Sequence, residues 1–325
     1  MLTTSHEKPG KGVLRFLIFQ ILAMPFILFS GWLFAGIGAN PGDLALVRQA
    51  TILLSFGFAF LLAIFPFYSW IPMLAEEIHP YVAGFLFWIL PTVTLFLGLG
   101  FLDRYTWLRE TPALNTILTT VGILMVVTGG SLAAFQRQLG RIMGYATIVE
   151  IGFSILALSF GNQTGLRIFL ILLVPRTLTL CTLALALSIL KKEAPLLRLN
   201  DVKGMGRIWP FAASGLALSI LALAGLPLLA GFPAHQAVWE ALASISLPFT
   251  SWVFIGSIGL FVSAVRVLLA FTIAPSKSPW EIRETTGQRL FVGAGILGLF
   301  LLGLFPQWAL PLWTKLPAIL EHFTK

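Results

Sequence analysis

Two long apolar runs of this chain are interrupted by proline and glycine, first at Phe65-Pro66-Phe67-Tyr68-Ser69-Trp70-Ile71-Pro72 and again at Gly225-Leu226-Pro227-Leu228-Leu229-Ala230-Gly231-Phe232. A proline inside a lipid-embedded helix frees backbone groups that hydrocarbon cannot pair, so such breaks persist only where protein buries them or where they line a polar path. Paired breaks in corresponding segments point to a transport site between two structural repeats. The residues that we assign to these breaks are Pro66, Pro72, Gly225, Pro227 and Gly231.

The composition indicates a membrane protein. Hydrophobic residues make up 58% of the 325 residues and charged residues 10%, and the mean hydropathy is +0.92, which a water-soluble domain of this length does not reach. The net charge of +8 would suit a nucleic-acid-binding protein, but the basic residues lie in short loops between apolar runs. They form neither one patch nor a basic helix, so we expect no nucleic-acid partner.

Crossing the hydrocarbon core takes about 20 apolar residues. The sequence therefore predicts an all-α integral membrane protein with about nine transmembrane helices, two of them discontinuous. The predicted spans are 13–37, 50–74, 82–102, 115–135, 142–160, 166–190, 210–246, 250–273 and 289–312. The second and the seventh contain the breaks.

Basic residues are distributed unevenly over the predicted loops. If the N-terminus is cytoplasmic, the inner loops hold Lys8, Lys11, Arg15, Arg137, Arg141, Lys191, Lys192, Arg198, Lys203, Arg207, Lys277, Arg283 and Arg289, and the outer ones Arg48, Arg104, Arg109, Arg167, Lys315 and Lys325. The positive-inside rule then predicts a cytoplasmic N-terminus and a C-terminus outside.

Motifs for soluble catalysis are missing from the sequence. It has no phosphate-binding glycine loop, no cysteine or histidine cluster with metal-ligand spacing and no nucleophile elbow. We therefore expect this chain to have no cofactor, no metal and no catalytic residue of its own.

Ionisable side chains inside apolar spans are costly, and each one is a functional candidate. His235 directly follows the second break, where an imidazole can relay protons, or can simply donate to a carbonyl freed by Pro227 or Pro233. Glu240 stands one helical turn from Gln236 and can share that face or lie near the outer interface.

Two further candidates lie in the spans between the breaks. Glu150 shares a helical face with Thr147 and Ser154, and it is either a proton carrier or a neutral acid hydrogen-bonded across helices. Arg176 follows Pro175, and its guanidinium cannot deprotonate, so we expect it to pair with Glu150 or to hold freed carbonyls. Arg266 is near enough to the inner face to extend toward it. The candidates for a proton path are Glu150, His235, Glu240 and Arg176.

Three ordered landmarks carry a family resemblance. They are Gln136-Arg137-Gln138-Leu139-Gly140-Arg141-Ile142-Met143-Gly144-Tyr145-Ala146-Thr147-Ile148 with Gly152-Phe153, then Val202-Lys203-Gly204-Met205-Gly206-Arg207 with the second break, and Pro66-Phe67-Tyr68-Ser69-Trp70-Ile71-Pro72. From Val13 onward the chain resembles the antiporter-like, proton-translocating membrane subunits of respiratory complex I, and most closely the NADH-quinone oxidoreductase subunit N type.

The resemblance implies a single membrane domain, 1–325, built from two inverted five-helix repeats with one discontinuous helix each. It implies a first repeat over 13–103 that lacks its two opening helices, a second over 114–273, and a final transmembrane helix over 289–313. It further implies protons moving through charged residues on a central axis, NADH and quinone chemistry in other subunits, and a place in an energy-transducing membrane such as the bacterial inner membrane. Its partners would be other membrane subunits, lipid and protons.

The chain departs from the family at most of the expected lysines. Before the first break, where the family usually has a lysine, this chain has Leu61, Leu62 and Ala63. In the next span the family's lysine would align near Thr92 or Val93. Around Arg176, the expected histidine and lysine fall near Val174 and Leu178. His235 aligns with a lysine or glutamate, and Glu150 with a frequent histidine. The chain is therefore a proton-translocating subunit of a complex I-like or hydrogenase-type assembly, or a degenerate scaffold subunit that conducts nothing. A stand-alone cation/proton antiporter is the weaker third hypothesis.

Overall fold

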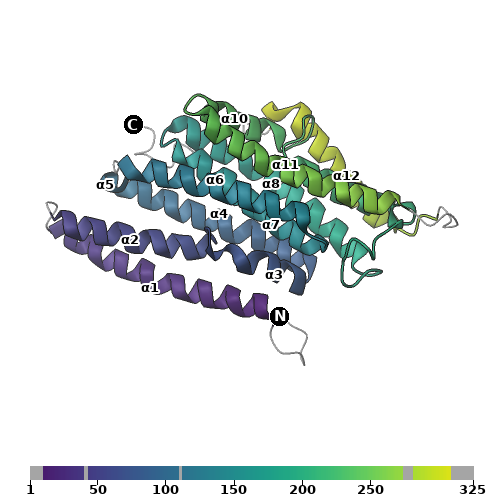
Figure 1. The fold of residues 1–325 in the computed structure, drawn as a ribbon, viewed down its shortest axis with the longest axis horizontal. Coiled ribbons are helices and arrows are strands. Elements are labelled where there is room, and N and C mark those ends of the chain that lie inside the picture. The colour runs from purple at the N-terminus through teal and green to yellow at the C-terminus, as the bar shows by residue number, and fades with distance from the viewer. Residues whose placement is uncertain (1–9, 40–42, 110–111, 274–280, 309–325) are drawn as a thin grey trace.

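The computed structural model describes residues 10–39, 43–109, 112–273 and 281–308, and this part of the chain is a bundle of helices without a β-strand (Figure 1). The helices are α1 (Lys11–Ala39), α2 (Leu44–Leu61), α3 (Trp70–Glu77), α4 (Pro80–Arg104), α5 (Thr106–Arg109), α6 (Pro112–Phe135), α7 (Leu139–Ser159), α8 (Gln163–Leu190), α9 (Pro210–Leu223), α10 (Phe232–Ala243), α11 (Leu247–Thr272) and α12 (Thr286–Leu304). Short 3-10 turns occupy Phe67–Ser69, Met205–Arg207 and Pro306–Trp308.

Within these described ranges, 8 helices are long and apolar enough to cross a membrane, and the shorter α9 is apolar as well. The prediction of an all-helical membrane protein with two discontinuous spans is therefore confirmed, the discontinuous spans being α2–α3 and α9–α10. The final helix ends at Leu304, and residues 309–313 of the predicted last span lie outside the described residues.

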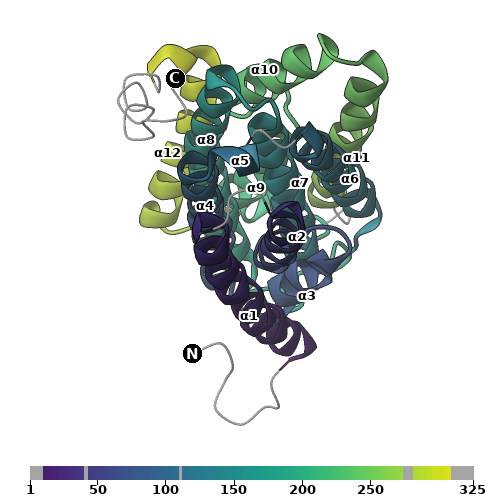
Figure 2. The same cartoon turned by 90° about the vertical axis from the view of Figure 1, so that its left-hand side faces the viewer.

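Helix α7 occupies the interior of the bundle. In its most apolar window 89% of the residues are buried, against 17% in α1 and 11% in α12, which lie at the periphery. Figure 2 looks along the bundle and shows α7 and α9 surrounded by other helices. Helix α7 packs against both α3 and α10, which are the second halves of the two discontinuous spans.

The first discontinuous span breaks in a Schellman motif at the end of α2. The amide of Ile64 donates to the carbonyl of Ala59, and the amide of Ala63 donates to the carbonyl of Phe60. Ala63 has a φ of 51°, the left-handed conformation that this motif requires. Pro66 comes three residues later and cannot continue the helix.

The second break repeats the motif at the end of α9. Here the amide of Leu226 donates to the carbonyl of Leu221, and the amide of Gly225 to that of Ala222. Gly225 has a φ of 77° and is the residue type that adopts this conformation without steric cost. Both breaks thus pair the carbonyls of an ended helix inside the bundle, where hydrocarbon offers no partner.

The sequence assigns Pro72 to the first break, and the structure places it just after that break. Pro72 is the third residue of α3, and the first amides of a helix have no intrahelical acceptor, so a proline there removes no helical hydrogen bond. Gly231 is likewise the residue at the start of α10 rather than the point of interruption.

A glycine permits the close approach of α7 to α3. A Cβ on Gly144 would lie 2.7 Å from the Cα of Pro72, which is closer than real Cβ atoms come. The contact seats the half-helix α3 directly on the buried helix α7.

Two carboxylates cap the N-termini of helices at one end of the bundle. Glu284 is 5% exposed, and its oxygens accept from the amides of Phe211 and Ala212 at 3.2 and 2.8 Å, at the start of α9. Glu77 accepts from the amides of Gly12 and Val13 at the start of α1. A negative charge at a helix N-terminus is stabilising, and both bonds join segments far apart in the sequence.

Positive charge is also concentrated at this end. Lys191 donates to the carbonyl of Ile78 at 3.2 Å, and burial lowers the pKa of Lys191. Burial, together with the charge of Lys191, lowers the pKa of His79. The Nδ1 atom of a neutral His79 can accept a hydrogen bond from the amide of Tyr81, the second residue of α4, at 3.4 Å.

The two break residues allow a reciprocal test. Gly225→Ala places a Cβ in a left-handed conformation and should lower the free energy of unfolding by about 1–2 kcal/mol. Ala63→Gly removes the corresponding strain at the first break and should be tolerated. Equilibrium unfolding in mixed detergent micelles measures both, and equal losses would contradict the shared motif.

Removing the Glu284 carboxylate should destabilise the protein. Glu284→Ala leaves two amides of α9 unpaired, one buried and one partly buried, at an expected cost of about 1–3 kcal/mol in the free energy of unfolding. Glu281→Ala is the matched control, because Glu281 forms only an exposed ion pair with Arg283. A thermal-shift measurement that gives both variants the same melting temperature would exclude the capping role.

Candidate functional site

A buried carboxyl–imidazole pair connects α7 with the second break. Glu150 lies in the middle of α7 and His235 in the first turn of α10, and the Nε2 atom of His235 is 3.0 Å from Oε1 of Glu150. The two side chains are 3% and 0% exposed. The sequence suggested each residue separately, and the fold brings them together.

The imidazole is held in a fixed orientation. The ring of Phe153, one turn beyond Glu150 on α7, stacks on it with centroids 4.0 Å apart and planes at 14°. The other ring nitrogen, Nδ1, is buried and has no hydrogen-bond partner in the described part of the chain. It faces Gly225, where a Cβ would come within 2.9 Å. His235 therefore pairs with a carboxyl group rather than with a carbonyl freed by a proline.

Arg176 approaches the pair from α8. Its guanidinium is buried and donates to the carbonyl of Phe87 at 3.2 Å. That carbonyl lies one turn before Pro91 of α4, which has no amide to pair with it. The alternative in which Arg176 holds a freed carbonyl is the one observed, and the carbonyl belongs to α4 rather than to the helix of Arg176 itself.

Arg176, Glu150 and His235 face one narrow gap, with Thr179 and Gly231 also in its wall. The gap is too narrow for a water-sized sphere. Arg176 forms no ion pair with Glu150, and its Nε and one terminal nitrogen have no partner among the described residues. The guanidinium is thus a fixed positive charge beside the pair.

The charges of this cluster allow one exchangeable proton. With Arg176 always positive, the cluster is neutral overall when Glu150 is ionised and His235 is uncharged. One added proton, shared across the 3.0 Å contact, raises the net charge by one.

In the part of the chain that the structure describes, no buried carboxyl–imidazole pair lies at the first break. Its surroundings are aromatic, with Phe60 and Phe67 centroids 4.6 Å apart and Phe16 and Trp70 centroids 5.0 Å apart. The mid-span Trp88 donates its indole N–H to the hydroxyl of Thr177 at 2.7 Å. The two breaks share a backbone motif but not a set of ionisable side chains.

Glu240 and Arg266 lie apart from the buried pair. Glu240 is exposed on α10 and accepts from its neighbour Gln236 at 2.7 Å, as the one-turn spacing predicted. Arg266 extends from α11 toward the end of the bundle, where it donates to the carbonyl of Ala134 at the end of α6. Thr147 and Ser154 bond carbonyls of their own helix rather than the carboxyl group of Glu150.

Sequence reasoning missed the Phe87 carbonyl as a part of the site. Pro91, in the middle of an apolar run, was the available signal, since a proline frees the carbonyl four residues before it. The sequence alone does not say which distant side chain pairs with that carbonyl.

Comparison with known proteins agrees with this architecture. Residues 20–263 match the family model described as NADH:quinone oxidoreductase/Mrp antiporter, TM. The chain belongs to this family. It is 26% identical over 322 residues to NADH-quinone oxidoreductase subunit N of Rhodococcus opacus, covering 93% of this chain and 59% of that protein. With subunit N 1 of Rhizobium meliloti it is 29% identical, covering 83% of this chain and 56% of that protein. The chain thus spans less than two thirds of the length of these relatives.

Solved structures share the fold. A chain of the archaeal membrane-bound sulfane sulfur reductase superposes with a TM-score of 0.88 at 17% identity, covering 100% of this chain and 68% of that one. A chain of the Mrp complex from Dietzia superposes with a TM-score of 0.80 at 16% identity, covering 91% of this chain and 65% of that one. A chain of respiratory complex I from Thermus thermophilus superposes with a TM-score of 0.77 at 20% identity, covering 96% of this chain and 68% of that one.

The contact between Arg176 and the Phe87 carbonyl predicts a thermodynamic coupling with Pro91. Arg176→Met leaves the carbonyl unpaired, whereas Pro91→Ala supplies an amide for it. Arg176→Met should therefore cost about 1 kcal/mol less in the Pro91→Ala background than in the native one. A double-mutant cycle of unfolding in detergent micelles measures this coupling, and strict additivity would contradict the contact.

Proposed function

We propose that this chain is a membrane subunit of a complex I-like NADH-quinone oxidoreductase, or of a related hydrogenase-type complex, and that it moves protons through its second repeat. The observation that carries the proposal is the buried contact between Glu150 and His235 at the second helix break. Ionisable groups at membrane depth are expensive to bury, and proton relays are a main reason for keeping them there.

Each residue has a separate role in the proposed relay. Glu150 and His235 hold and pass the proton, because both change charge with one proton. Arg176 does not transfer protons. Its guanidinium places a fixed positive charge beside the pair.

The family membership supports the assembly context. The relatives bear the name of an NADH-quinone oxidoreductase subunit, and the solved neighbours come from multi-subunit respiratory and antiporter complexes. In the proposal the other subunits carry the redox chemistry, and this chain has no cofactor of its own. As an enzyme it is at most the proton-translocating part of a translocase.

The proposed repeats are 13–103 and 114–273, followed by the last helix. The chain runs through the two discontinuous spans in opposite directions, so that α3 and α10 end at opposite ends of the bundle (Figure 1), as inverted repeats require. We place the basic end in the cytoplasm and the N-terminus with it, in a bacterial inner membrane, by the positive-inside rule.

A non-conducting scaffold subunit is the second candidate. Two observations favour it: the gap beside Arg176 is too narrow for water, and among the described residues the first break has no buried carboxyl–imidazole pair. In that role the helix breaks preserve shape, and the buried pair holds α10 against α7.

Proton pumping by the reconstituted complex distinguishes the candidates. Glu150→Gln and His235→Ala should each lower proton flux at least about tenfold, because each removes one partner of the relay. Glu240→Gln is the matched control, since Glu240 is exposed and outside the buried pair.

The assembly of each variant complex must be verified by its subunit composition. Unchanged pumping stoichiometry in both buried variants would exclude the relay and favour the scaffold. Equal losses in all three variants would instead indicate a defect common to α7 and α10.

A further inference from the structure

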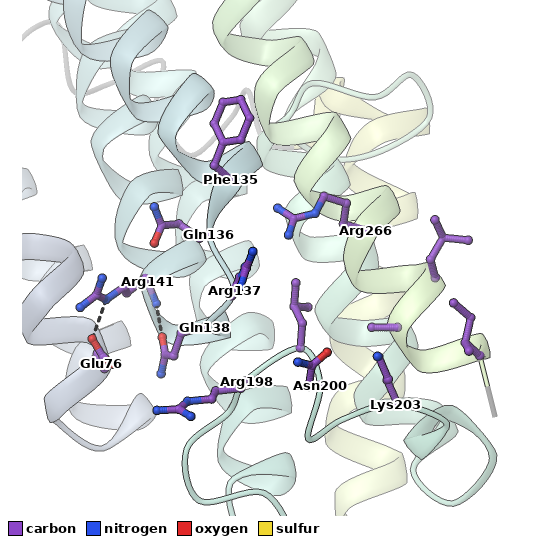
Figure 3. A pocket seen from close by; sticks show the side chains of 14 residues that line it. Glu76, Phe135, Gln136, Arg137, Gln138, Arg141, Arg198, Asn200, Lys203 and Arg266 are labelled. Atoms are coloured by element: carbon purple, nitrogen blue, oxygen red, sulfur yellow. Dashed lines mark hydrogen bonds and ion pairs between the residues drawn. The ribbon is translucent and has the colours of Figure 1, made fainter. Parts of the chain in front are cut away.

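A basic pocket lies at the end of the bundle where α6 ends and α7 begins (Figure 3). Its volume is about 790 Å³. The charged side chains in its wall are Arg137, Arg141, Arg198, Lys203 and Arg266 against one carboxylate, Glu76. Figure 3 shows Arg266 extending sideways from α11 toward the side of the pocket where Arg137 lies. This pocket is separate from the buried pair of Glu150 and His235.

Backbone hydrogen bonds fix the walls of this pocket. The amide of Leu139 donates to the carbonyl of Leu197 at 2.9 Å, and the amide of Leu199 to that of Arg137 at 2.8 Å. These bonds hold the connection after α8 against the start of α7. The amide of Gly204 donates to the carbonyl of Ala270, which ties the same connection to α11. The cations therefore converge on a preformed space.

Only some of these cationic side chains form an ion pair or a hydrogen bond within the described part of the chain. Arg141 pairs with Glu76 at 2.5 Å, and Arg266 donates to the carbonyl of Ala134. The side chains of Arg137, Arg198 and Lys203 have no such partner among the described residues. Loop cations that only set membrane orientation have no reason to converge on one cavity with a single carboxylate.

The rim of the pocket is apolar on one side. Phe135, at the last residue of α6, is 78% exposed, and Leu269 and Ile273, at the end of α11, are 52% and 59% exposed. These side chains lie where two membrane-spanning helices end, which is the level of the lipid headgroups. A ligand that fits must therefore carry negative charge on one part and hydrocarbon on another.

We propose that this pocket binds the phosphate headgroup of an anionic phospholipid, with the acyl chains running over Phe135, Leu269 and Ile273. Arginine and lysine both suit phosphate oxygens, arginine through paired N–H donors. Basic pockets between membrane helices at the cytoplasmic surface are suited to anionic lipid headgroups. The proposal is independent of proton translocation, because a scaffold subunit would keep the pocket as well.

Lipid retention tests the proposal on the purified full-length chain. The protein is reconstituted with equal amounts of phosphatidylglycerol and phosphatidylcholine, and native mass spectrometry counts the lipids that remain bound. The native chain should retain phosphatidylglycerol preferentially. Arg137→Gln with Lys203→Gln should reduce this retention about tenfold, since each lost cation contributes near the membrane surface.

The matched control is Lys11→Gln with Lys192→Gln. It removes the same charge from the same end of the bundle but outside the pocket, and its side chains are exposed, so it should retain phosphatidylglycerol like the native chain. Equal losses in both double variants would reduce the effect to general surface charge and overturn the proposal.

Two further measurements distinguish a bound phospholipid from a soluble anion and from a partner subunit. Excess inorganic phosphate should leave lipid retention unchanged relative to chloride at the same ionic strength, and displacement by phosphate alone would mean that the pocket binds a soluble anion. If the Arg137→Gln, Lys203→Gln variant keeps its lipid but fails to join the assembled complex, the pocket binds a partner subunit. Either result would overturn the lipid assignment.

Discussion

The requirement that buried backbone groups find partners without water governs this fold. Hydrocarbon offers no hydrogen bonds, so an interrupted helix must pair its own free carbonyls or borrow a donor from another helix. The chain uses both solutions. Its two breaks end in crossed backbone bonds around Ala63 and Gly225, and the carbonyl freed by Pro91 takes a donor from Arg176. The capping residues Ala63 and Gly225 and the side chain of Arg176 are all buried in the bundle.

Helix α7 gives the two breaks different consequences. Gly144 seats α3 on one part of α7, and this contact is steric and apolar. Glu150 meets His235 of α10 further along the same helix, and this contact is polar and can change charge. The same backbone motif thus accompanies a purely steric contact at the first break and a buried polar contact at the second. The difference arises from side chains, because the aromatic residues around Pro66 offer no group that exchanges protons near neutral pH.

Much of this architecture follows from the sequence, since apolar length and proline position are local signals. The spans, both interruptions and the candidates Glu150 and His235 could be predicted in this way. Pro72, assigned to the first break from the sequence, lies in the first turn of α3, because a proline is compatible with a helix start as well as with a break. The contact of Arg176 with Phe87 and the cap from Glu284 were not predictable, since each joins residues more than 70 positions apart. Pairing over such separations depends on the packing of whole helices.

If the second repeat conducts, a displacement of half-helix α10 would open the site. A proton can reach Glu150 through water only if the gap beside Arg176 widens. Helix α7 runs through the site without a proline, so displacing it would disturb intrahelical bonds, whereas α8 carries Pro175 next to Arg176. Helix α10 starts afresh at the break, and its displacement would separate His235 from Glu150 while leaving Arg176 on the Phe87 carbonyl. A second positive charge on His235, facing Arg176, would favour this opening because it demands hydration. Proton uptake and access to water would then be coupled through one short helix.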